Sequence, residues 1–188
     1  MLAVPAVVGL GAAWFTNQQS QISDASREEQ QREAALQGYL DTMSGLLLHD
    51  NLRDSQPENE VGVVARTRTW TTLRLLDPGR KKILLKFLEE ADLIRIIDLS
   101  KADLSGTDLR GFDLRGANLS EANLYESNLH EANLSGAALN YADLQGAKLD
   151  ESNLDGLDLK EARGVTMEQL EKAYSLKGTR LPDGSIHP

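Results

Sequence analysis

The sequence predicts a mainly β fold, a stacked solenoid that follows an α-helical region and ends in a short C-terminal helix. Three observations lead to this prediction. Leucine occupies every fifth position from Leu99 to Leu159 without a gap, which gives thirteen copies of a repeat. Helical spacing of apolar residues precedes this series, and a helix-capping motif follows it. The expected segments are residues 1–16, 17–91, 92–162 and 163–188.

The first segment, residues 1–16, begins with MLAVPAVVGLGAAWF, a run that carries no charged side chain. A membrane span needs about 20 apolar residues, so the run is short. No basic stretch precedes it, as a signal peptide would require. Trp14 and Phe15 stand where aromatic anchors meet a membrane interface. We therefore expect a truncated membrane helix, with a signal peptide or a helix buried against the protein as alternatives.

The second segment, residues 17–91, shows apolar spacings of three and four that are typical of helices. Helices are expected at Asp24–Asp50, Glu60–Leu76 and Arg80–Ala91, with a break at Asp77–Gly79. We expect this region to lie next to the membrane and to cover the start of the solenoid. The side chains predicted to point inward are Leu36, Leu40, Met43, Leu47, Val64, Thr67, Trp70 or Thr71, Leu73, Ile83, Leu84, Phe87 and Leu88.

The third segment, residues 92–162, has a period of five, which fits neither a helix nor a strand. On an α-helix the leucines would rotate by about 140° at each step and form no stripe. The pattern predicts a short extended stretch and a turn, with the leucine and the small residue two positions before it pointing inward. Asp or Asn usually precedes the leucine, and glycine often follows two positions after it, which suits corners.

These pentads, among them ADLSG, ANLSE, ANLYE, ANLHE and ADLQG, resemble the A(D/N)LXX motif of the pentapeptide-repeat family. The resemblance covers roughly residues 97–161. It implies a right-handed quadrilateral β-helix with four pentads, and therefore 20 residues, in each coil. The helical stretch before the repeats resembles the corresponding region of membrane-associated bacterial members of this family.

The last segment, residues 163–188, is expected to cover the far end of the solenoid, because an open sheet edge recruits other strands. Within it, GVTMEQLEKAY is predicted to form a helix that begins at Thr166, with Gln169 completing a capping box. The next residues, LKGTRLPDGS, are predicted to form a closing strand and turn.

Composition and motifs restrict the chemistry of the chain. There is no cysteine, which excludes disulfides, thiolate catalysis and cysteine-based zinc sites. The sequence has no local metal-ligand motif, no glycine-rich phosphate loop and no nucleophile motif. His130 is expected to face solvent, and a structural role explains aspartates that recur at one repeat position. We therefore predict no catalytic residue, no cofactor-binding residue and no metal ligand, and expect that the protein is not an enzyme.

The strongest basic cluster consists of Arg80, Lys81, Lys82 and Lys86 in the third predicted helix. The simplest interpretation is a solvated helix face. The alternative is contact with anionic lipid headgroups, which attract clustered lysine and arginine.

The sequence favours a non-enzymatic, membrane-tethered scaffold that binds an unidentified protein partner. It would attach through residues 1–16 and hold its repeats on the cytoplasmic side. The net charge of −9 argues against binding nucleic acid. The alternative is a DNA mimic that binds a topoisomerase such as gyrase, because residues 92–162 hold 14 acidic and 6 basic residues. The short rod and its interruption by Arg110, Arg115 and Lys148 favour the scaffold. The pattern carries no signal for an oligomeric state.

Overall fold

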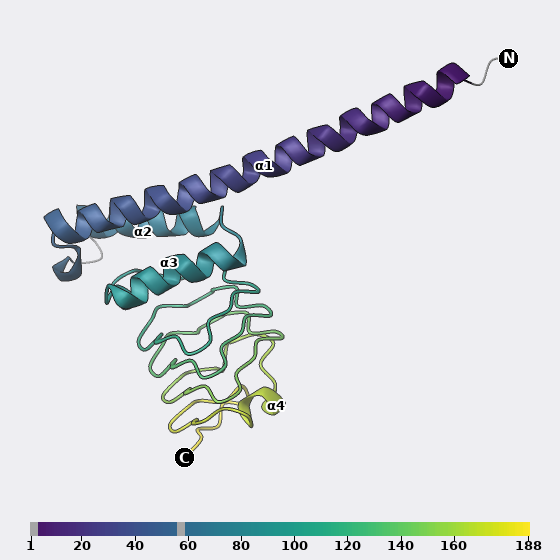
Figure 1. Ribbon diagram of the computed structural model, residues 1–188. Coiled ribbons are helices and arrows are strands. Elements are labelled where there is room, and N and C mark those ends of the chain that lie inside the picture. The colour runs from purple at the N-terminus through teal and green to yellow at the C-terminus, as the bar shows by residue number, and fades with distance from the viewer. Residues whose placement is uncertain (1–3, 56–58) are drawn as a thin grey trace.

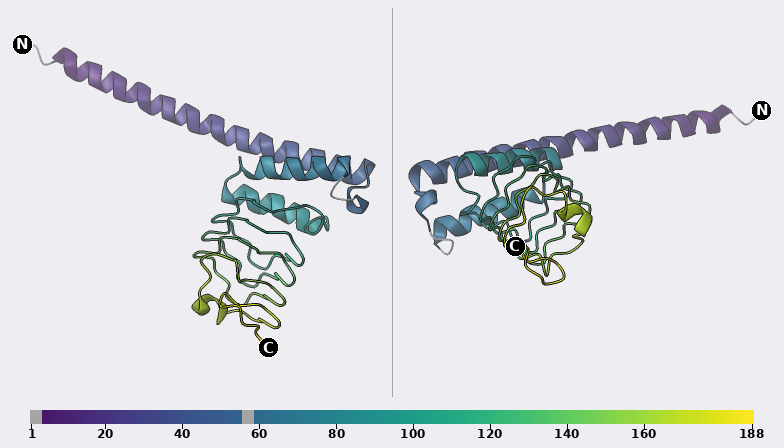
Figure 2. Two further views of the ribbon diagram at one scale, coloured as in Figure 1. Left: turned by 180° about the vertical axis from the view of Figure 1, so that it is seen from behind. Right: turned by 90° about the horizontal axis from the view of Figure 1, so that it is seen from below.

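The structure, a computed structural model, describes residues 4–55 and 59–188, with side chains from residue 24 onward within those ranges. Its helices are α1 (Val4–His49), α2 (Glu60–Leu73), α3 (Pro78–Glu90) and α4 (Met167–Leu170), with a short 3-10 turn, η1 (Leu52–Asp54). Figure 1 shows that α1 and α2 lie above α3, and that α3 lies on a stack of coils. The N-terminal part of α1 extends well beyond the stack (Figure 2).

Local sequence explains where α2 and α3 begin. The side chain of Asn59 accepts a hydrogen bond from the Gly62 amide at 2.8 Å, and Asp77 accepts one from the Arg80 amide at 3.1 Å. Such caps satisfy amides that have no partner inside the helix. Pro78 occupies the first turn of α3, where a missing N–H costs nothing. The Asp77–Gly79 break is thus the start of α3, two residues earlier than predicted.

The buried faces of α2 and α3 differ from the prediction. In α2 the buried residues are Gly62, Ala65, Thr69, Thr72 and Leu73, whereas Val64 is exposed. These small side chains leave room for α1 to pack against α2. The hydroxyl of Tyr39 in α1 lies 2.9 Å from Thr69 Oγ1 in α2, within hydrogen-bond distance. In α3, Ile83 is 52% exposed, and Lys81, Leu84, Leu85 and Leu88 are buried.

The repeats form stacked coils in which residues 20 apart pair. Parallel bridges join Asp103 to Asn123 and Asn123 to Asp143. The Leu104 amide donates to the Asn123 carbonyl at 2.8 Å, and the Asn123 amide donates to the Ala102 carbonyl at 2.9 Å. This register confirms four pentads per coil. Seen from below, the coils are stacked along one axis (Figure 2).

The predicted inward positions are confirmed. Leucines such as Leu134 and small residues such as Ala132 are fully buried, and the intervening Asn133 is only partly exposed. Two positions after each leucine from Leu99 to Leu154 the backbone turns with positive φ, as at Gly136, where φ is 67°. A left-handed residue at this place is typical of a type II turn. Six corners hold other residues in the same conformation, namely Lys101, Glu121, Glu126, Glu131, Tyr141 and Glu151.

The prediction of a mainly β class is wrong in its proportions. The pairing between described coils consists of isolated bridges, because each pentad leaves too few extended residues between corners for a continuous strand. By contrast, α1 alone has 46 residues. The β-helical stack preceded by helices is confirmed, and its right-handed sense stays a prediction.

The C-terminal segment folds back onto the last coils of the stack. Thr166 and Gln169 form the predicted capping box, but α4 ends at Leu170. The chain then returns to the coils, where Ser175 pairs with Asn153 and Arg180 pairs with Asp158 in parallel bridges. Arg180 also pairs with Ile186 in an antiparallel bridge, which completes the closing strand and turn.

The predicted membrane localisation, with the repeats on the cytoplasmic side, is wrong. Among the residues that the structure describes, no helix combines the length and the apolar character that a membrane span requires. The physical reason lies in the sequence of α1. Its apolar run ends at Phe15, and the helix then continues with the polar residues TNQQSQ. The run is thus shorter than the roughly 20 apolar residues that a span requires. Residues 1–3 and the side chains of residues 4–16 lie outside the described part.

Candidate interaction surface

The basic cluster of α3 pairs with carboxylates of the protein itself. Arg80 pairs with Glu29 and Glu33 of α1 and with Asp77, the N-cap of α3. Lys81 pairs with Asp103 at 2.9 Å, Lys82 with Asp108 at 2.7 Å, and Lys86 with Glu89 of the same helix at 2.6 Å. Arg80 therefore links α3 to α1, and Lys81 and Lys82 link it to the first coil. Lys81 is buried, so the solvated helix face that we expected is found only in part, at Lys86.

Carboxylates on the first coil have lowered pKa values. For Asp103, burial raises the pKa, but hydrogen bonds from Lys81 and Ser105 lower it more, so it lies below its ordinary value. Hydrogen bonds from Arg110 and Lys82 hold the pKa of Asp108 far below its usual range. A general acid or base works best with a pKa near the operating pH. These aspartates are therefore suited to permanent ion pairs.

Helix α3 also supplies a hydrogen-bond acceptor to a backbone amide at the exposed edge of the first coil. Inside the stack, the Asn133 amide donates to the Phe112 carbonyl one coil earlier, at 2.9 Å. Asp113 has no earlier coil, and its amide donates instead to the carboxylate of Glu89 at 2.7 Å. Covering an edge in this way prevents pairing with other strands. The predicted cover at the start of the repeats is thus built by α3.

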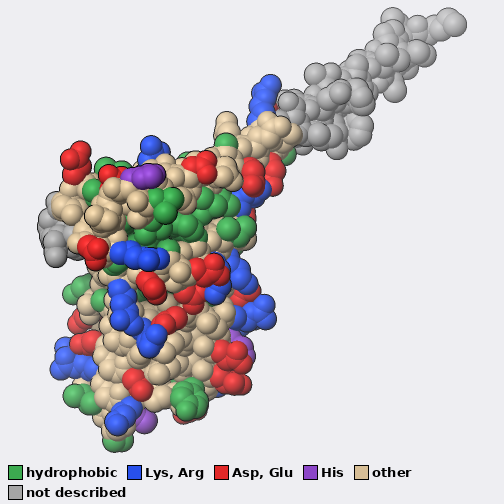
Figure 3. Space-filling view, turned by 60° about the vertical axis from the view of Figure 1, so that its left-hand side comes forward, with side chains coloured by type: hydrophobic (Ala, Val, Ile, Leu, Met, Phe, Trp, Pro, Cys, Tyr) green, Lys and Arg blue, Asp and Glu red, His purple; other side chains and the backbone are tan. Residues whose placement is uncertain are grey.

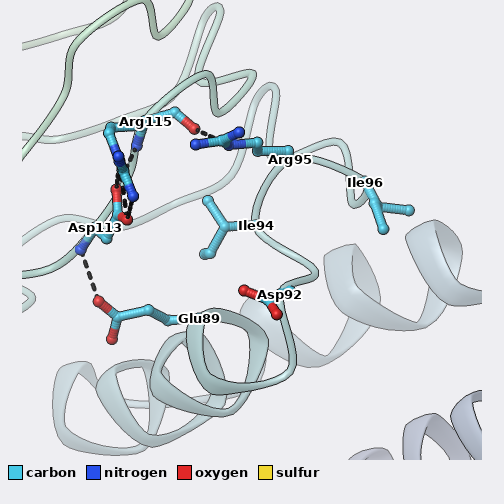
Figure 4. A pocket seen from close by; sticks show the side chains of 7 residues that line it. All are labelled: Glu89, Asp92, Ile94, Arg95, Ile96, Asp113 and Arg115. Atoms are coloured by element: carbon cyan, nitrogen blue, oxygen red, sulfur yellow. Dashed lines mark hydrogen bonds and ion pairs between the residues drawn. The ribbon is translucent and has the colours of Figure 1, made fainter. Parts of the chain in front are cut away.

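A pocket of about 390 Å³ lies where the end of α3 meets the first coil (Figure 4). Ile94 lies between its charged side chains. Arg115 pairs with Asp113 at 2.5 Å, and Arg95 Nε donates to the Arg115 carbonyl at 3.1 Å. The lining residues are Glu89, Asp92, Ile94, Arg95, Ile96, Asp113 and Arg115. Glu89, Arg95, Asp113 and Arg115 already have partners within the protein, so these side chains hold the end of α3 against the first coil.

One side of the stack presents aromatic and amide side chains. We define the tyrosine face as Asn123, Tyr125, Tyr141, Asp143 and Gln145. Asn123 and Asp143 are bridged neighbours, and Tyr125 and Tyr141 are 40% and 51% exposed. A hydrogen bond to Glu126 raises the pKa of the Tyr125 hydroxyl.

Another corner of the stack has no side chains. Gly116, Gly136 and Gly156 share this corner, each with positive φ, as the 20-residue register predicts. The neighbouring outward residues in these columns are polar or charged, for example Arg115, Ser135 and Asp155. The stack therefore presents different chemistry on different sides.

Sequence reasoning missed a group of side chains around His130. The ligand atoms of His130, Glu131 and Glu151 all lie within 4.8 Å of one another. His130 is half-buried, and its Nδ1 lies 3.0 Å from the Asp150 carbonyl oxygen, whereas we expected a solvated side chain. The signal was available in the spacing, because Glu131 and Glu151 are 20 residues apart and so occupy adjacent coils.

Comparison with known proteins places residues 97–136 and 127–163 in matches to a family model described as pentapeptide repeats, in 8 copies. HetL, a pentapeptide repeat protein involved in heterocyst differentiation regulation in the cyanobacterium Nostoc sp. strain PCC 7120, is 40% identical over 48% of this chain and 41% of HetL, with a TM-score of 0.43. A pentapeptide repeat protein from the Arabidopsis thaliana thylakoid lumen is 29% identical over 44% of this chain and 60% of that chain, with a TM-score of 0.22. This chain spans less than two thirds of either protein. The comparison with curated proteins found no match.

Proposed function

We propose that this chain, whose residues 97–163 belong to the pentapeptide-repeat family, is a non-enzymatic scaffold that binds a protein partner through its tyrosine face. The observation that supports this most is the exposure of Tyr125 and Tyr141 on a stack whose other described sides are mostly small or charged. Tyrosine is enriched at protein interfaces and supplies large contact area at little conformational cost.

The rigidity of this face supports the same function. The Leu124 amide donates to the Asp143 carbonyl at 2.8 Å, and the Glu126 amide donates to the Gln145 carbonyl at 2.9 Å. The backbone beneath the tyrosines is therefore held on both coils. A preformed surface loses less entropy on binding than a flexible one. We further propose that residues 17–91 and 163–188 serve as end covers of the repeat unit, residues 92–162.

The ion pairs count against the alternative of a DNA mimic. Duplex DNA presents about one negative charge for each 1.7 Å of its axis. In this chain three aspartates of the first coil are neutralised by basic side chains. Asp103 pairs with Lys81, and Asp113 pairs with Arg115. Asp108 pairs with both Lys82 and Arg110. The acidic surface is thus interrupted at the start of the rod, and the tyrosine face adds apolar area that phosphates lack.

Proximity labelling in the native host tests this function, with the labelling enzyme fused to the C-terminus. The test variant carries Tyr125→Ser and Tyr141→Ser, and the control carries Ser135→Ala on another side of the stack. Circular dichroism melts establish that both variants fold. We expect the proteins enriched by the wild type to be lost with the tyrosine variant and kept with the control. The proposal is wrong if both variants label the same proteins as the wild type.

A further inference from the structure

We propose that His130, Glu131 and Glu151 form a binding site for a divalent transition-metal ion of the Zn²⁺ type. The three side chains offer one imidazole nitrogen and two carboxylate oxygens, all within 4.8 Å of one another. Because Zn–N and Zn–O bonds are about 2 Å long, two ligands of one ion lie at most about 4 Å apart. Small rotations of the exposed Glu131 and Glu151 side chains would bring the three atoms within this reach. The site lies apart from the tyrosine face, so it does not depend on the proposed function.

The repeat itself assembles these ligands. Glu131 and Glu151 occupy the same repeat position in successive coils, and both have a φ of 58° at the corner. The Glu131 amide donates to the Asp150 carbonyl at 3.0 Å, which fixes the two coils against each other at this point. His130 is the residue directly before Glu131. The 20-residue register therefore brings Glu131 and Glu151 together, and adjacency in the chain adds His130.

The hydrogen bond of His130 leaves the correct nitrogen for a metal. The Asp150 carbonyl oxygen, 3.0 Å from Nδ1, can only accept, so Nδ1 carries the proton. In the neutral Nδ1–H tautomer, Nε2 carries a lone pair, and it lies 3.5 Å from Glu131 Oε1. A lone pair facing a carboxylate is repulsive unless a proton or a metal ion lies between them. Metal-bound histidines typically donate their other N–H to a backbone carbonyl or a carboxylate in this manner.

The donor set indicates which ions fit. Imidazole suits Zn²⁺, Ni²⁺ and Cu²⁺, whereas Mg²⁺ and Ca²⁺ prefer oxygen ligands alone. Arg110, which acts electrostatically on Glu131, is held by Asp108 through bonds of 2.9 and 3.0 Å. This pairing with Asp108 occupies the Nε and Nη2 donors of Arg110. An ion bound here would join two coils, so it should stabilise the stack as well as bind to it.

Isothermal titration of the full chain with ZnCl₂ near neutral pH measures the affinity, and thermal unfolding measures the stabilisation. His130→Asn and Glu151→Gln are the test variants. Glu121→Gln is the matched control because it changes the same repeat position at another corner, and His187→Asn controls for an exposed histidine. We expect Zn²⁺ to bind the wild type and both controls with similar affinity, and the test variants at least tenfold more weakly.

NMR of the imidazole separates the metal site from a simple imidazolium–carboxylate pair. Zn²⁺ should shift the His130 Nε2 resonance and raise the melting temperature of the wild type, while equal Mg²⁺ should do neither. The inference is overturned if His130→Asn binds Zn²⁺ as tightly as the wild type. Unchanged His130 resonances in Zn²⁺, or an equal effect of Mg²⁺, would also overturn it.

Discussion

Within each pentad, the small inward position shows how one side chain decides local stability. Most copies use alanine there, which fills the narrow space without a polar atom. Ser152 is buried, and its hydroxyl donates to the Leu149 carbonyl at 2.6 Å. Among the described residues, the buried hydroxyls of Ser127 and Thr107 have no hydrogen-bond partner. The same repeat position therefore holds satisfied and unsatisfied hydroxyls.

This difference predicts opposite effects of one substitution. Ser127→Ala should raise the free energy of unfolding by about 1 kcal/mol, because it removes a buried hydroxyl without a partner. Ser152→Ala should lower it by about 1 kcal/mol, because it removes a hydrogen bond. Urea unfolding of the two variants measures both changes. The explanation fails if both substitutions shift the midpoint in the same direction.

At the scale of elements, α3 connects the helical layer to the coils. Lys81 is only 4% exposed, and its ammonium group lies 2.9 Å from Asp103. Lys86 lies over the ring of Phe112, 5.5 Å from its centroid, which adds a cation–π contact to the same junction. The aspartate of the repeat motif thus has a second use on the first coil, where it binds a lysine from another element.

Equivalent aspartates should therefore respond differently to asparagine. Asp103→Asn leaves the buried Lys81 without its charged partner and should cost about 1–3 kcal/mol of stability. Asp143→Asn should change stability by less than about 0.5 kcal/mol, because asparagine can still accept the hydrogen bond from the Gln145 amide. Chemical unfolding compares the two variants.

A second substitution tests the cause of that difference. Lys81→Met in the Asp103→Asn background removes the unpaired charge and should recover most of the lost stability. Equal costs for Asp103→Asn and Asp143→Asn, or no recovery with Lys81→Met, would contradict the assigned role of the ion pair.

Across the whole molecule, charge and apolar surface are distributed unevenly. In Figure 3 hydrophobic side chains gather over the helical layer, while acidic and basic side chains are interspersed down the stack. Several of the acidic groups, including Asp77, Asp103, Asp108 and Asp113, have pKa values below the ordinary aspartate value. Asp103 and Asp108 join the first coil to α3, so their protonation should loosen this junction.

These lowered pKa values predict acid sensitivity with a definite sign. A carboxyl whose pKa is lower in the folded state contributes stability above its unfolded pKa, about 3.9, and loses it as the pH falls through the folded value. The free energy of unfolding should therefore fall as the pH drops from about 5 towards 2. Asp108→Asn should make this decrease shallower, because it removes a carboxyl whose pKa is lowered. Urea unfolding across a pH series measures the slopes, and identical slopes for the wild type and Asp108→Asn would refute the prediction.

The sequence by itself determined the repeat unit of this protein. The inward leucine, the turn two positions later and the Thr166 capping box depend on residues that are close in the chain, and the period then places residues 20 apart in adjacent coils. These features could be predicted because a repeated local pattern generates its own long-range contacts. The same register contained the His130, Glu131 and Glu151 group, which a search for local motifs overlooked.

Only the tertiary structure decided how the helices meet the coils. The periodicity of α2 and α3 shows that they have apolar faces, but it does not say which neighbour they pack against, and small residues such as Ala65 formed the contact while Val64 and Ile83 stayed exposed. The local pattern likewise did not predict which carboxylate each lysine of α3 would bind. Charges pair with whatever carboxylate the packing brings within reach, and that placement depends on the relative orientation of separate elements.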